Sequence, residues 1–391
     1  MIDSFKITGG KKLYGSIDIE SAKNAVLPLV AGALLTQETI VINNIPDISD
    51  VYKMFEIIRL MGGSVEICEG SAIISATLNK TEIPKGLASE IRSSIFMLGS
   101  LLATYKIAKV AYPGGCDIGS RPIDLHLMGL RCLGAKIIER HGYIYCNGEN
   151  MKSGIVHLDF PSVGATENIM MASVMLEGDT FIYNPAKEPE IEDLQNFINA
   201  MGGIVSGAGT SVIKITGVKK LHGVSYTPIP DRIVAGTYLI AGAMAGGKIE
   251  LKNVIPEHIY SLITKLTQSG CVISAKGGNI YLESNSRPIS CPSIATQPYP
   301  GFPTDLQAQI LALQSISNGI SIVTENLFET RFKHVAELIK MGAKITVKDR
   351  SAIVHGVSVL YGAEVEGHDL RGTASLVLAG LCAEGVTTVH G

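Results

Sequence analysis

The sequence predicts an α/β protein of two domains, each built from three copies of one structural unit. Five segments share the same order of elements: a helix rich in Ala, Gly and Leu, a short strand, an amphipathic second helix and two closing strands. The copies begin at intervals of 71, 70, 68 and 73 residues, at Ser21, Arg92, Ser162, Pro230 and Pro303. A sixth copy begins at Asp369 and the chain stops inside it, at Gly391, so we expect this repeat to be incomplete.

The first helix of each unit is expected to be buried. These helices are apolar on nearly every side and contain many small residues, as is typical of helices surrounded by protein. We expect them at 21–35, 92–104, 162–178, 230–247 and 303–319, with a sixth from 369. Three buried helices inside a ring of strands and outer helices would be a natural packing for each domain.

The second helix of each unit is amphipathic and is followed by glycine. The stretch DVYKMFEIIRLMGG at 50–63 shows the pattern, with apolar residues three and four positions apart. Glycine ends a helix well because it takes the left-handed backbone conformation without steric cost. The same ending predicts helices that stop before Gly62, Gly134, Gly202, Gly270 and Gly342, each followed by paired strands.

The domain boundary is expected near LHGVSYTPIPDR, where Pro228 and Pro230 interrupt the repeat pattern. One domain would take residues 23–229, including the glycine-rich loop around Cys116. The other would take residues 230–391 together with residues 1–22. We expect the amino-terminal segment, FKITGG followed by YGSIDIE, to complete this second domain as a hairpin, because a ring of repeats needs closing strands.

Composition excludes several classes of protein. The formal net charge is -3 and there is no basic cluster, so neither nucleic acid nor a membrane surface is an expected partner. Seven cysteines without a CxxC pair predict reduced thiols and no metal site. The amino terminus lacks a signal-peptide core and the apolar runs are too short to cross a bilayer. We therefore expect a soluble, cytoplasmic protein that uses no cofactor.

The stretch YPGGCDIGSRPIDLH, residues 112–126, places a cysteine, an arginine and an aspartate among glycines. A free cysteine is most often a small buried apolar residue. Cys116, however, is flanked by glycines and followed by Arg121, which gives it access and a nearby positive charge, the two conditions for a reactive thiol. We therefore predict that Cys116 is reactive and lies on an exposed loop.

The amino ends of the buried helices are candidate anion sites. Unpaired N–H groups and the helix dipole favour an anion there. The ends carry Lys23 and Asn24, Arg92, Ser162 to Gly164, Asp231 and Arg232, Asp305, and Asp369 with Arg371. Polar residues at such positions are often simple helix caps, and Ser21, Ser162, Thr304 and Asp231 fit that interpretation. A cation in a first turn opposes the dipole, so for Lys23, Arg92 and Arg371 a bound anion is the simplest explanation.

Three further polar residues have two interpretations. Arg331 follows a strand of the fifth repeat, and either binds a ligand or forms a salt bridge with Glu325 or Glu329. His126 and His334 lie on second helices. A packed or surface position is favoured over a catalytic one for both histidines.

With these residues assembled, the chain resembles the enolpyruvyl transferases. The matching motifs are SAKNAVLP, PGGCDIGSRPIDLH, PSVGATENIM, PDRIVAGTYL, FPTDLQAQ, TENLFETRFKHVAEL and DLRGTASLVLAG. They cover nearly the whole chain in the family's order. The resemblance implies an inside-out α/β barrel of two domains, each made of three βαβαββ-like repeats, that close on the ligands between them.

The resemblance also implies roles for individual residues. Cys116 matches the general acid of the lid loop, which fosfomycin alkylates in the family, and Asp305 matches the group thought to take a proton from the sugar hydroxyl. The groups that hold phosphate and carboxylate match Lys23, Arg92, Arg121, Arg331, Asp369, Leu370 and Arg371. The nucleotide-sugar contacts match Arg121, Pro122, Ile123, Asp124, Leu125, Ser162, Val163 and Gly164, with Asp124 toward the uracil. Asn24 matches a contact between the ligands and Leu327 a position near the sugar.

Two departures from the family pattern stand out. Some members carry lysine where this chain has Phe160, which affects a charged contact to the diphosphate. The family also continues beyond the strand matched by GVTTVHG with a second helix, closing strands and an arginine of the phosphoenolpyruvate site. Repeat spacing implies that roughly 20 to 30 residues would complete the sixth unit. The chain is either truncated or naturally incomplete there.

The expected activity is metal-free transfer of an enolpyruvyl group from phosphoenolpyruvate to the 3-hydroxyl of UDP-N-acetylglucosamine, the first committed step of peptidoglycan synthesis. Such a reaction needs an acid, a base and several fixed cations in a dry site. No obligatory protein partner is expected. Two alternatives are a non-catalytic nucleotide-sugar-binding paralogue and an enzyme that acts on shikimate 3-phosphate.

Overall fold

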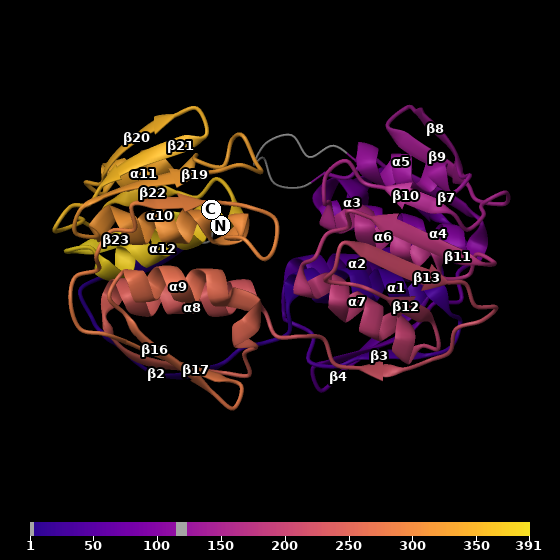
Figure 1. Cartoon of the computed structure of the whole chain (residues 1–391), viewed down its shortest axis with the longest axis horizontal. Helices are drawn as coiled ribbons and strands as arrows, with labels where there is room; N and C mark the ends of the chain where they lie inside the picture. Colours follow the sequence, from indigo (N-terminus) through magenta and orange to yellow (C-terminus); the bar gives the residue numbers. More distant parts are fainter. Residues whose placement is uncertain (1–3, 115–122) are drawn as a thin grey trace. The chain divides into compact units, whose positions relative to one another are not determined.

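The computed structural model describes residues 4–114 and 123–391, which form two compact units (Figure 1). Unit 1 contains residues 4–19 and 230–391, and unit 2 contains residues 20–114 and 123–229. Each unit has its own hydrophobic core.

Unit 2 contains three four-stranded sheets of one design. In each sheet an edge strand pairs in parallel with its neighbour, and the two remaining pairings are antiparallel. The first sheet has the order β14 (Ser225–Tyr226), β3 (Ile40–Ile42), β5 (Ser71–Ser75) and β4 (Ser64–Cys68). The second is β6 (Glu82–Ile83), β7 (Ile107–Ala111), β9 (Tyr143–Asn147) and β8 (Lys136–Arg140). The third is β10 (Ile155–His157), β11 (Asp179–Tyr183), β13 (Val212–Thr216) and β12 (Ile204–Ser206).

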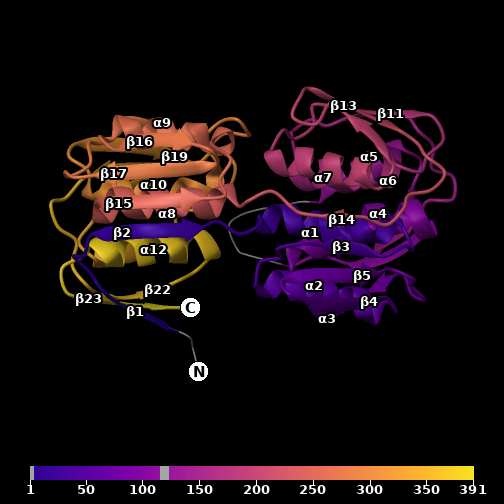
Figure 2. The ribbon, with the colours of Figure 1, turned by 90° about the horizontal axis from the view of Figure 1, so that it is seen from below.

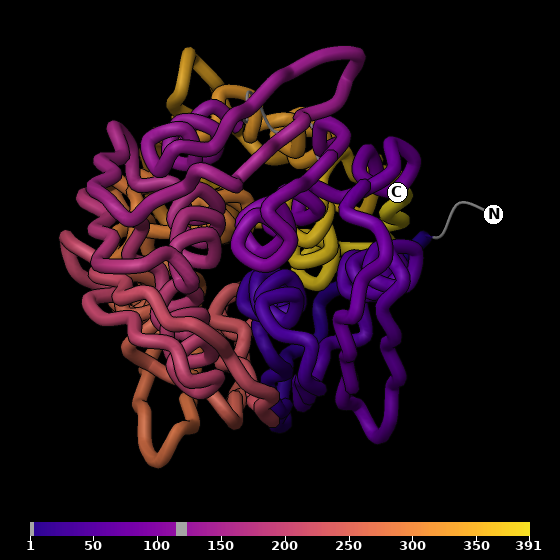
Figure 3. The backbone as a smooth tube through the Cα atoms, turned by 90° about the vertical axis from the view of Figure 1, so that its right-hand side faces the viewer, coloured from indigo at the N-terminus to yellow at the C-terminus, as the bar shows by residue number. Residues whose placement is uncertain are grey.

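The helices of unit 2 fall into a buried set and an outer set. The buried helices are α1 (Lys23–Gly32), α4 (Met97–Tyr105) and α6 (Val163–Ser173), and they appear end-on in Figure 3. The 3-10 segments η1 (Ala33–Leu35) and η2 (Arg92–Phe96) adjoin α1 and α4. The outer helices are α2 (Ser49–Leu60), α5 (Asp124–Cys132) and α7 (Pro189–Ala200). A short helix that the sequence pattern did not indicate, α3 (Lys85–Glu90), precedes η2.

Unit 1 has the same design, except that one of its sheets has three strands instead of four (Figure 2). The first four-stranded sheet has the order β2 (Leu13–Asp18), β15 (Gly247–Lys252), β17 (Asn279–Ser284) and β16 (Val272–Lys276). The second has the order β18 (Ser293–Ala295), β19 (Ile320–Thr324), β21 (Ser351–His355) and β20 (Lys344–Lys348). The third sheet has the order β1 (Ser4–Thr8), β23 (Val386–His390), β22 (Glu364–Glu366). The inner helices are α8 (Arg232–Ala245), α10 (Gln307–Ile316) and α12 (Leu370–Cys382). α8 and α10 are largely buried, whereas fewer than half of the residues of α12 are buried. The outer helices are α9 (Tyr260–Gln268) and α11 (His334–Lys340), and 3-10 segments lie at η3 (Pro256–Ile259) and η4 (Thr304–Leu306).

Two local expectations are confirmed. The first helices of the five complete copies are mainly buried: every residue of α10 is buried, and in α1 only the first two residues are partly exposed. In α12, the first helix of the sixth copy, fewer than half of the residues are buried. The glycines after the second helices have left-handed backbone angles, with φ values of 102°, 94°, 90°, 95° and 95° at Gly62, Gly134, Gly202, Gly270 and Gly342. Burial and chain reversal therefore follow from residue type at these positions.

The expected amino-terminal hairpin is wrong. β1 and β2 do not pair with each other: β1 runs antiparallel to β23, with Ser4 opposite His390, and β2 runs parallel to β15. Each strand thus fills an edge of a different sheet of unit 1. The connection between them contains Gly9 and Gly10, but the pairing partners lie far along the chain.

Among the helices in the described part of the chain, none is long and apolar enough to span a membrane.

Candidate active site

Asp305 is the centre of a charged cluster at the amino end of α10. It lies on η4, the single turn that leads into α10. Arg331 places Nη2 2.7 Å from Oδ1 of Asp305, and Arg371 places Nη2 3.2 Å from Oδ2. The side chain of Asp305 is 26% exposed, whereas those of Arg331 and Arg371 are 4% and 14% exposed. The structure therefore brings together three residues that the sequence selected separately.

The charge of Asp305 is set by its neighbours. Burial alone would raise its pKa, but the positive charges of Arg371, Arg331 and Arg232 outweigh burial and hold the pKa well below the ordinary value. The carboxylate is therefore ionised across the physiological range. Asp305 is a weak base in this paired state, because Arg331 and Arg371 stabilise its carboxylate anion at both oxygens.

A second layer of side chains fixes Arg331. Thr304 accepts a hydrogen bond from Nη1 of Arg331 at 2.7 Å and donates to Oε2 of Glu325 at 2.8 Å. Glu325 is fully buried and also accepts from the hydroxyl of Thr296 and from the backbone N–H of Leu327. Of the two interpretations of Arg331, the salt bridge with Glu325 or Glu329 is wrong, because Arg331 pairs with Asp305 and Glu329 pairs with Arg350. Thr304 is likewise not a helix cap, since its hydroxyl serves this chain of hydrogen bonds.

The amino end of α12 contributes Asp369, Leu370 and Arg371. Oδ1 of Asp369 accepts from the backbone N–H groups of Arg371 and Gly372 at 3.0 Å each, so Asp369 is the N-cap of the helix. Leu370 is exposed. The cap holds the first turn, and with it Arg371, in place beside Asp305.

His334 lies buried at the start of α11, behind this cluster. Its side chain packs against α12, because a Cβ added to Gly372 would approach the Cβ of His334 to 3.1 Å. Neither ring nitrogen has a partner among the described residues. Burial lowers the pKa of His334 to about 4, an effect that Asp369 opposes and Arg331 reinforces. The ring is therefore neutral at physiological pH, as the packed interpretation of this histidine requires.

In unit 2, Lys23 is the first residue of α1. Its Nζ lies 2.6 Å from Oδ2 of Asp50 in α2, and both side chains are partly exposed. Lys23 and Arg371 thus each have a carboxylate partner within the protein, so a cation in a first turn does not by itself require a bound anion. Their role in binding a ligand stays a prediction. Asn24 follows Lys23 and is partly exposed. The interpretation of Ser21 as the cap of α1 is wrong, because the N-cap position is Ala22 and no side chain in the described part of the chain caps this helix.

Arg92 opens η2 rather than an α-helix. The chain turns once as a 3-10 segment before α4 begins at Met97. Arg92 thus lies at the entrance to a buried helix, as expected, but one turn further from α4 itself.

The predicted nucleotide-sugar contacts of unit 2 lie at the amino ends of two adjacent helices. Ser162 is the N-cap of α6 and its hydroxyl accepts from the N–H of Ala165 at 3.4 Å; Val163 and Gly164 form the first turn. α5 begins with Asp124 and Leu125, directly after Ile123. A Cβ on Gly164 would lie 2.8 Å from Cε1 of His126, so glycine lets α5 approach α6 at this point.

Several predicted residues have a simpler outcome. Cys116, Arg121 and Pro122 lie outside the described residues, so their roles stay predictions. Leu327 follows β19 and its N–H binds Glu325. Phe160 is 47% exposed beside the amino end of α6. Within the described ranges no group of three His, Cys, Asp or Glu side chains could hold a metal ion.

The sequence did not indicate three features of the site: the pairing of Asp50 with Lys23, the hydrogen bonds of Thr304 to Arg331 and Glu325, and the several hydrogen bonds that Glu325 accepts. Each acts through a partner that is distant in sequence, as with Thr304 and Glu325, which are 21 positions apart. One signal was available for Glu325, since this charged residue directly follows the end of β19.

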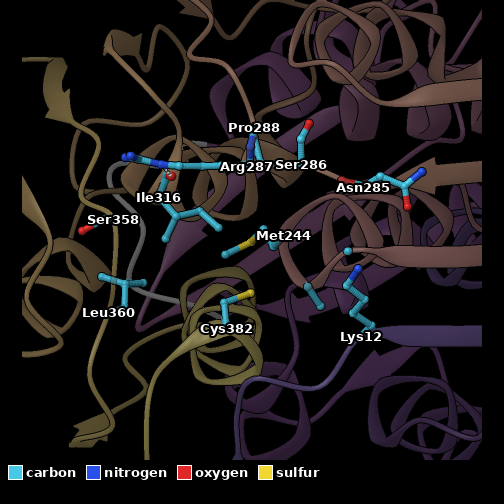
Figure 4. Close-up of a pocket in the computed structure, with 13 residues that line it drawn as sticks. Lys12, Met244, Asn285, Ser286, Arg287, Pro288, Ile316, Ser358, Leu360 and Cys382 are labelled. Atoms are coloured by element: carbon cyan, nitrogen blue, oxygen red, sulfur yellow. Dashed lines mark hydrogen bonds between the residues drawn. The ribbon is translucent and has the colours of Figure 1, made fainter.

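Unit 1 also contains a cavity of about 270 Å³ at the opposite end of its buried helices (Figure 4). Met244, Ile316 and Cys382, which line it, come from the last turns of α8, α10 and α12. Lys12 and Arg287 stand at its edge. Asp305, Leu370 and Arg371 do not line this cavity, since they lie at the amino ends of α10 and α12, whose last turns line it.

The chain belongs to the family of EPSP synthase, 3-phosphoshikimate 1-carboxyvinyltransferase, whose model matches residues 7–391. Within this family it is similar to UDP-N-acetylglucosamine 1-carboxyvinyltransferase 2 of Caldanaerobacter subterraneus, at 50% identity over 99% of this chain and 93% of the relative. UDP-N-acetylglucosamine 1-carboxyvinyltransferase of Thermotoga petrophila is 47% identical over 98% of this chain and 91% of the relative.

Solved structures share the fold. The enolpyruvyl transferase NikO from Streptomyces tendae superposes with a TM-score of 0.88 at 22% identity, over 98% of this chain and 92% of that one. EPSP synthase from Acinetobacter baumannii gives a TM-score of 0.74 at 20% identity, over 99% of this chain and 94% of that one. The architecture described above is thus the mixed α/β fold of enolpyruvyl transferases.

Proposed function

We propose that this enzyme transfers the enolpyruvyl group of phosphoenolpyruvate to the 3-hydroxyl of UDP-N-acetylglucosamine, with release of phosphate, as a step of peptidoglycan synthesis. The observation that carries the proposal is the pairing of Asp305 with Arg331 and Arg371, in a chain that is 50% identical to a UDP-N-acetylglucosamine 1-carboxyvinyltransferase. We also propose that it acts in the cytoplasm, on these two small molecules and without a macromolecular partner.

The proposed fold description is an inside-out α/β barrel in each of two domains. Residues 1–22 with 230–391 would form one enolpyruvyl-transferase domain, and residues 23–229 the other. In each unit, three buried helices and sheets of similar strand order support this description. Three βαβαββ-like repeats would then build each domain.

The reaction needs a base and a proton donor. Asp305 would take the proton of the sugar hydroxyl, and Cys116 would protonate the methylene carbon of phosphoenolpyruvate as the hydroxyl oxygen bonds to the adjacent carbon. Loss of phosphate and of a methyl proton from the resulting tetrahedral adduct then restores the vinyl group. Lys23, Arg92, Arg121, Arg331 and Arg371 would neutralise the phosphate and the carboxylate.

The arginines also explain how a weak base becomes an effective one. A ligand carboxylate that binds Arg331 and Arg371 competes with Asp305 for their donors. Loss of those interactions raises the proton affinity of Asp305, because the same two side chains hold the pKa of Asp305 low in the free enzyme. Asp305 would thus become an effective base only when the ligand that carries the carboxylate is bound.

Phosphate release with defined substrates tests the proposal. Purified enzyme is incubated with phosphoenolpyruvate and either UDP-N-acetylglucosamine or shikimate 3-phosphate, because the family model takes its name from the second reaction. We expect phosphate and a new enolpyruvyl product only with the nucleotide sugar, and loss of both in Cys116→Ala. Turnover with shikimate 3-phosphate alone would select the alternative enzyme, and binding of the nucleotide sugar without turnover would select a non-catalytic paralogue.

A further inference from the structure

Asp193 is a buried carboxylate on α7, and both of its oxygens accept hydrogen bonds. The residue is 2% exposed. Oδ1 accepts from the hydroxyl of Tyr226 at 2.7 Å, and Oδ2 accepts from the backbone N–H of Ile229 at 3.3 Å. Burial raises the pKa of Asp193 to about 6, although these two hydrogen bonds lower it. The side chain is therefore mainly ionised at neutral pH and acts as an acceptor at both oxygens.

Tyr226, the first partner of Asp193, is held from two sides. It is the last residue of β14, which pairs in parallel with β3, so that Tyr226 lies opposite Ile42. Its ring also packs edge-on against the ring of Phe197, one turn after Asp193 on α7, with the centroids 5.4 Å apart. α7 thus holds the end of β14 through a ring contact and a carboxylate.

Ile229, the second partner of Asp193, connects α7 to α1. Its carbonyl oxygen accepts a hydrogen bond from the backbone N–H of Ala22 at 2.8 Å. Ala22 is the N-cap residue of α1, and its own carbonyl accepts from the N–H groups of Ala25 and Val26 at 3.0 and 2.9 Å. The hydrogen bonds therefore run from Asp193 through Ile229 and Ala22 into the first turn of α1.

Two features of α1 explain why its start needs such an anchor. A side-chain cap often fixes the start of a helix, but among the described residues no side chain caps α1, whereas Ser162 caps α6. In addition, α4 and α6 follow the edge strands of their own sheets, β6 and β10, along the chain. The corresponding edge strand for α1 is β14, which the chain reaches only at the end of unit 2. The start of α1 can therefore be held beside β14 only by non-covalent contacts.

The start of α1 carries two residues of the candidate site. Lys23 and Asn24 directly follow Ala22, and both are partly exposed. The proposed function assigns Lys23 to the charged groups of phosphoenolpyruvate, and the family resemblance gives Asn24 a contact between the two ligands. A displacement of Ala22 would move both side chains, because they belong to the turn that Ala22 begins.

We propose that Asp193 is a positioning residue that fixes the first turn of α1, and with it Lys23 and Asn24, through the backbone of Ile229 and Ala22. The effect on catalysis rests on the proposed function, whereas the anchoring of α1 rests on the hydrogen bonds alone. A misplacement of about 1 Å can cost a reaction about 10² in rate, so loss of the anchor should be measurable in the kinetics.

The first test compares Asp193→Ala with Asp193→Asn. Alanine removes both acceptors. Asparagine keeps an oxygen for the N–H of Ile229 and can donate from Nδ2 to the hydroxyl oxygen of Tyr226, whose hydrogen can bind the backbone carbonyl of residue 193, 3.2 Å away. In Asp193→Ala, amide hydrogen exchange at Ile229 and Ala22, followed by nuclear magnetic resonance, should be about tenfold faster than in the parent protein.

The same two variants are compared in activity. In Asp193→Ala, kcat/KM for phosphoenolpyruvate at saturating UDP-N-acetylglucosamine should fall about tenfold. In Asp193→Asn, both the exchange rates and kcat/KM should stay within about threefold of the parent values. Unchanged exchange at Ala22 in Asp193→Ala would overturn the anchoring of α1. Faster exchange with the parent kcat/KM would overturn the positioning role.

Asn199→Ala is the matched control, because Asn199 is also on α7 and also accepts from a backbone N–H, that of Val205, at 2.8 Å. Val205 belongs to β12 and not to the start of α1. This variant should leave the exchange at Ala22 and kcat/KM unchanged. Equal losses of kcat/KM in Asn199→Ala and Asp193→Ala would contradict the proposal, since any damage to α7 would then have the same effect.

Ala22→Pro decides the matter if Asp193→Ala does not fold. Ala22 has a φ of -65°, the angle that proline requires, so this change removes the N–H and keeps the backbone conformation. We expect kcat/KM for phosphoenolpyruvate to fall about tenfold here too, and the parent value would contradict the proposal. A parent enzyme that does not turn over phosphoenolpyruvate with UDP-N-acetylglucosamine would refute the proposed function, while hydrogen exchange at Ala22 would still decide whether Asp193 anchors α1.

Discussion

At the scale of single residues, the charge on Asp305 is controlled by side chains that were selected for different reasons. Arg331 is nearly inaccessible and is held by Thr304, whereas Arg371 comes from the first turn of α12. Because Glu325 in turn holds Thr304, a change at this buried carboxylate should alter both stability and the placement of Arg331.

The first prediction therefore concerns Glu325→Ala. Glu325 is fully buried and accepts from two hydroxyls and two backbone N–H groups, so its loss leaves several donors unpaired. We expect the free energy of unfolding to fall by about 3 kcal/mol or more. Urea denaturation measures this change. Glu329→Ala, which removes an exposed ion pair with Arg350, is the control and should cost less than about 1 kcal/mol. Equal losses of unfolding free energy in the two variants would refute the role of Glu325 as the shared acceptor of these hydrogen bonds.

The second prediction concerns pH and His334, whose folded-state pKa is lowered to about 4 from 6.5. As pH falls below 6.5, the unfolded chain binds the proton first, so this residue makes the folded protein less stable until pH reaches about 4. His334→Gln lacks this effect. The stability of the parent protein minus that of the variant should fall by roughly 3 kcal/mol between pH 7 and pH 4. Denaturation at several pH values measures it, and a constant difference would contradict the neutral, buried ring.

At the scale of elements, helix ends were the most predictable feature. The glycine after each second helix acts locally, so its left-handed conformation follows from the neighbouring residues. Ser21 and Thr304 were less predictable, because a hydroxyl near a helix start can cap the helix or bind a distant group. Thr304 binds Glu325, which lies 21 residues away. Contacts of that kind depend on packing rather than on local pattern.

The third prediction uses two glycines with open surroundings. A Cβ would meet no atom within 4 Å at Gly270 or at Gly86, but Gly270 has a φ of +95°, whereas Gly86 lies inside α3 with an ordinary helical backbone. Gly270→Ala should destabilise the protein by about 1 kcal/mol through backbone strain. Gly86→Ala should stabilise it by about 0.5–1 kcal/mol, because alanine favours a helix. Thermal unfolding distinguishes them, and changes of the same sign would refute the assigned conformations.

At the scale of the whole molecule, the buried helices were predictable, whereas the strand pairing of the chain termini was not. The buried helices can be recognised from composition because they are apolar on nearly every side. The pairing of β1 with β23 could not, since Ser4 and His390 lie at opposite ends of the chain. The same limit applies to the site: Asp305, Arg331 and Arg371 were each selected, but their mutual pairing needed the structure.

The most direct test of the central claim is phosphate release by Asp305→Asn with phosphoenolpyruvate and UDP-N-acetylglucosamine at saturating concentrations. If Asp305 is the base that Arg331 and Arg371 control, kcat should fall by about 10² to 10⁴, the usual contribution of such a group. Glu329→Gln, a surface carboxylate outside the cluster, should keep the parent rate. An Asp305→Asn enzyme that turns over within about twofold of the parent rate would contradict the account.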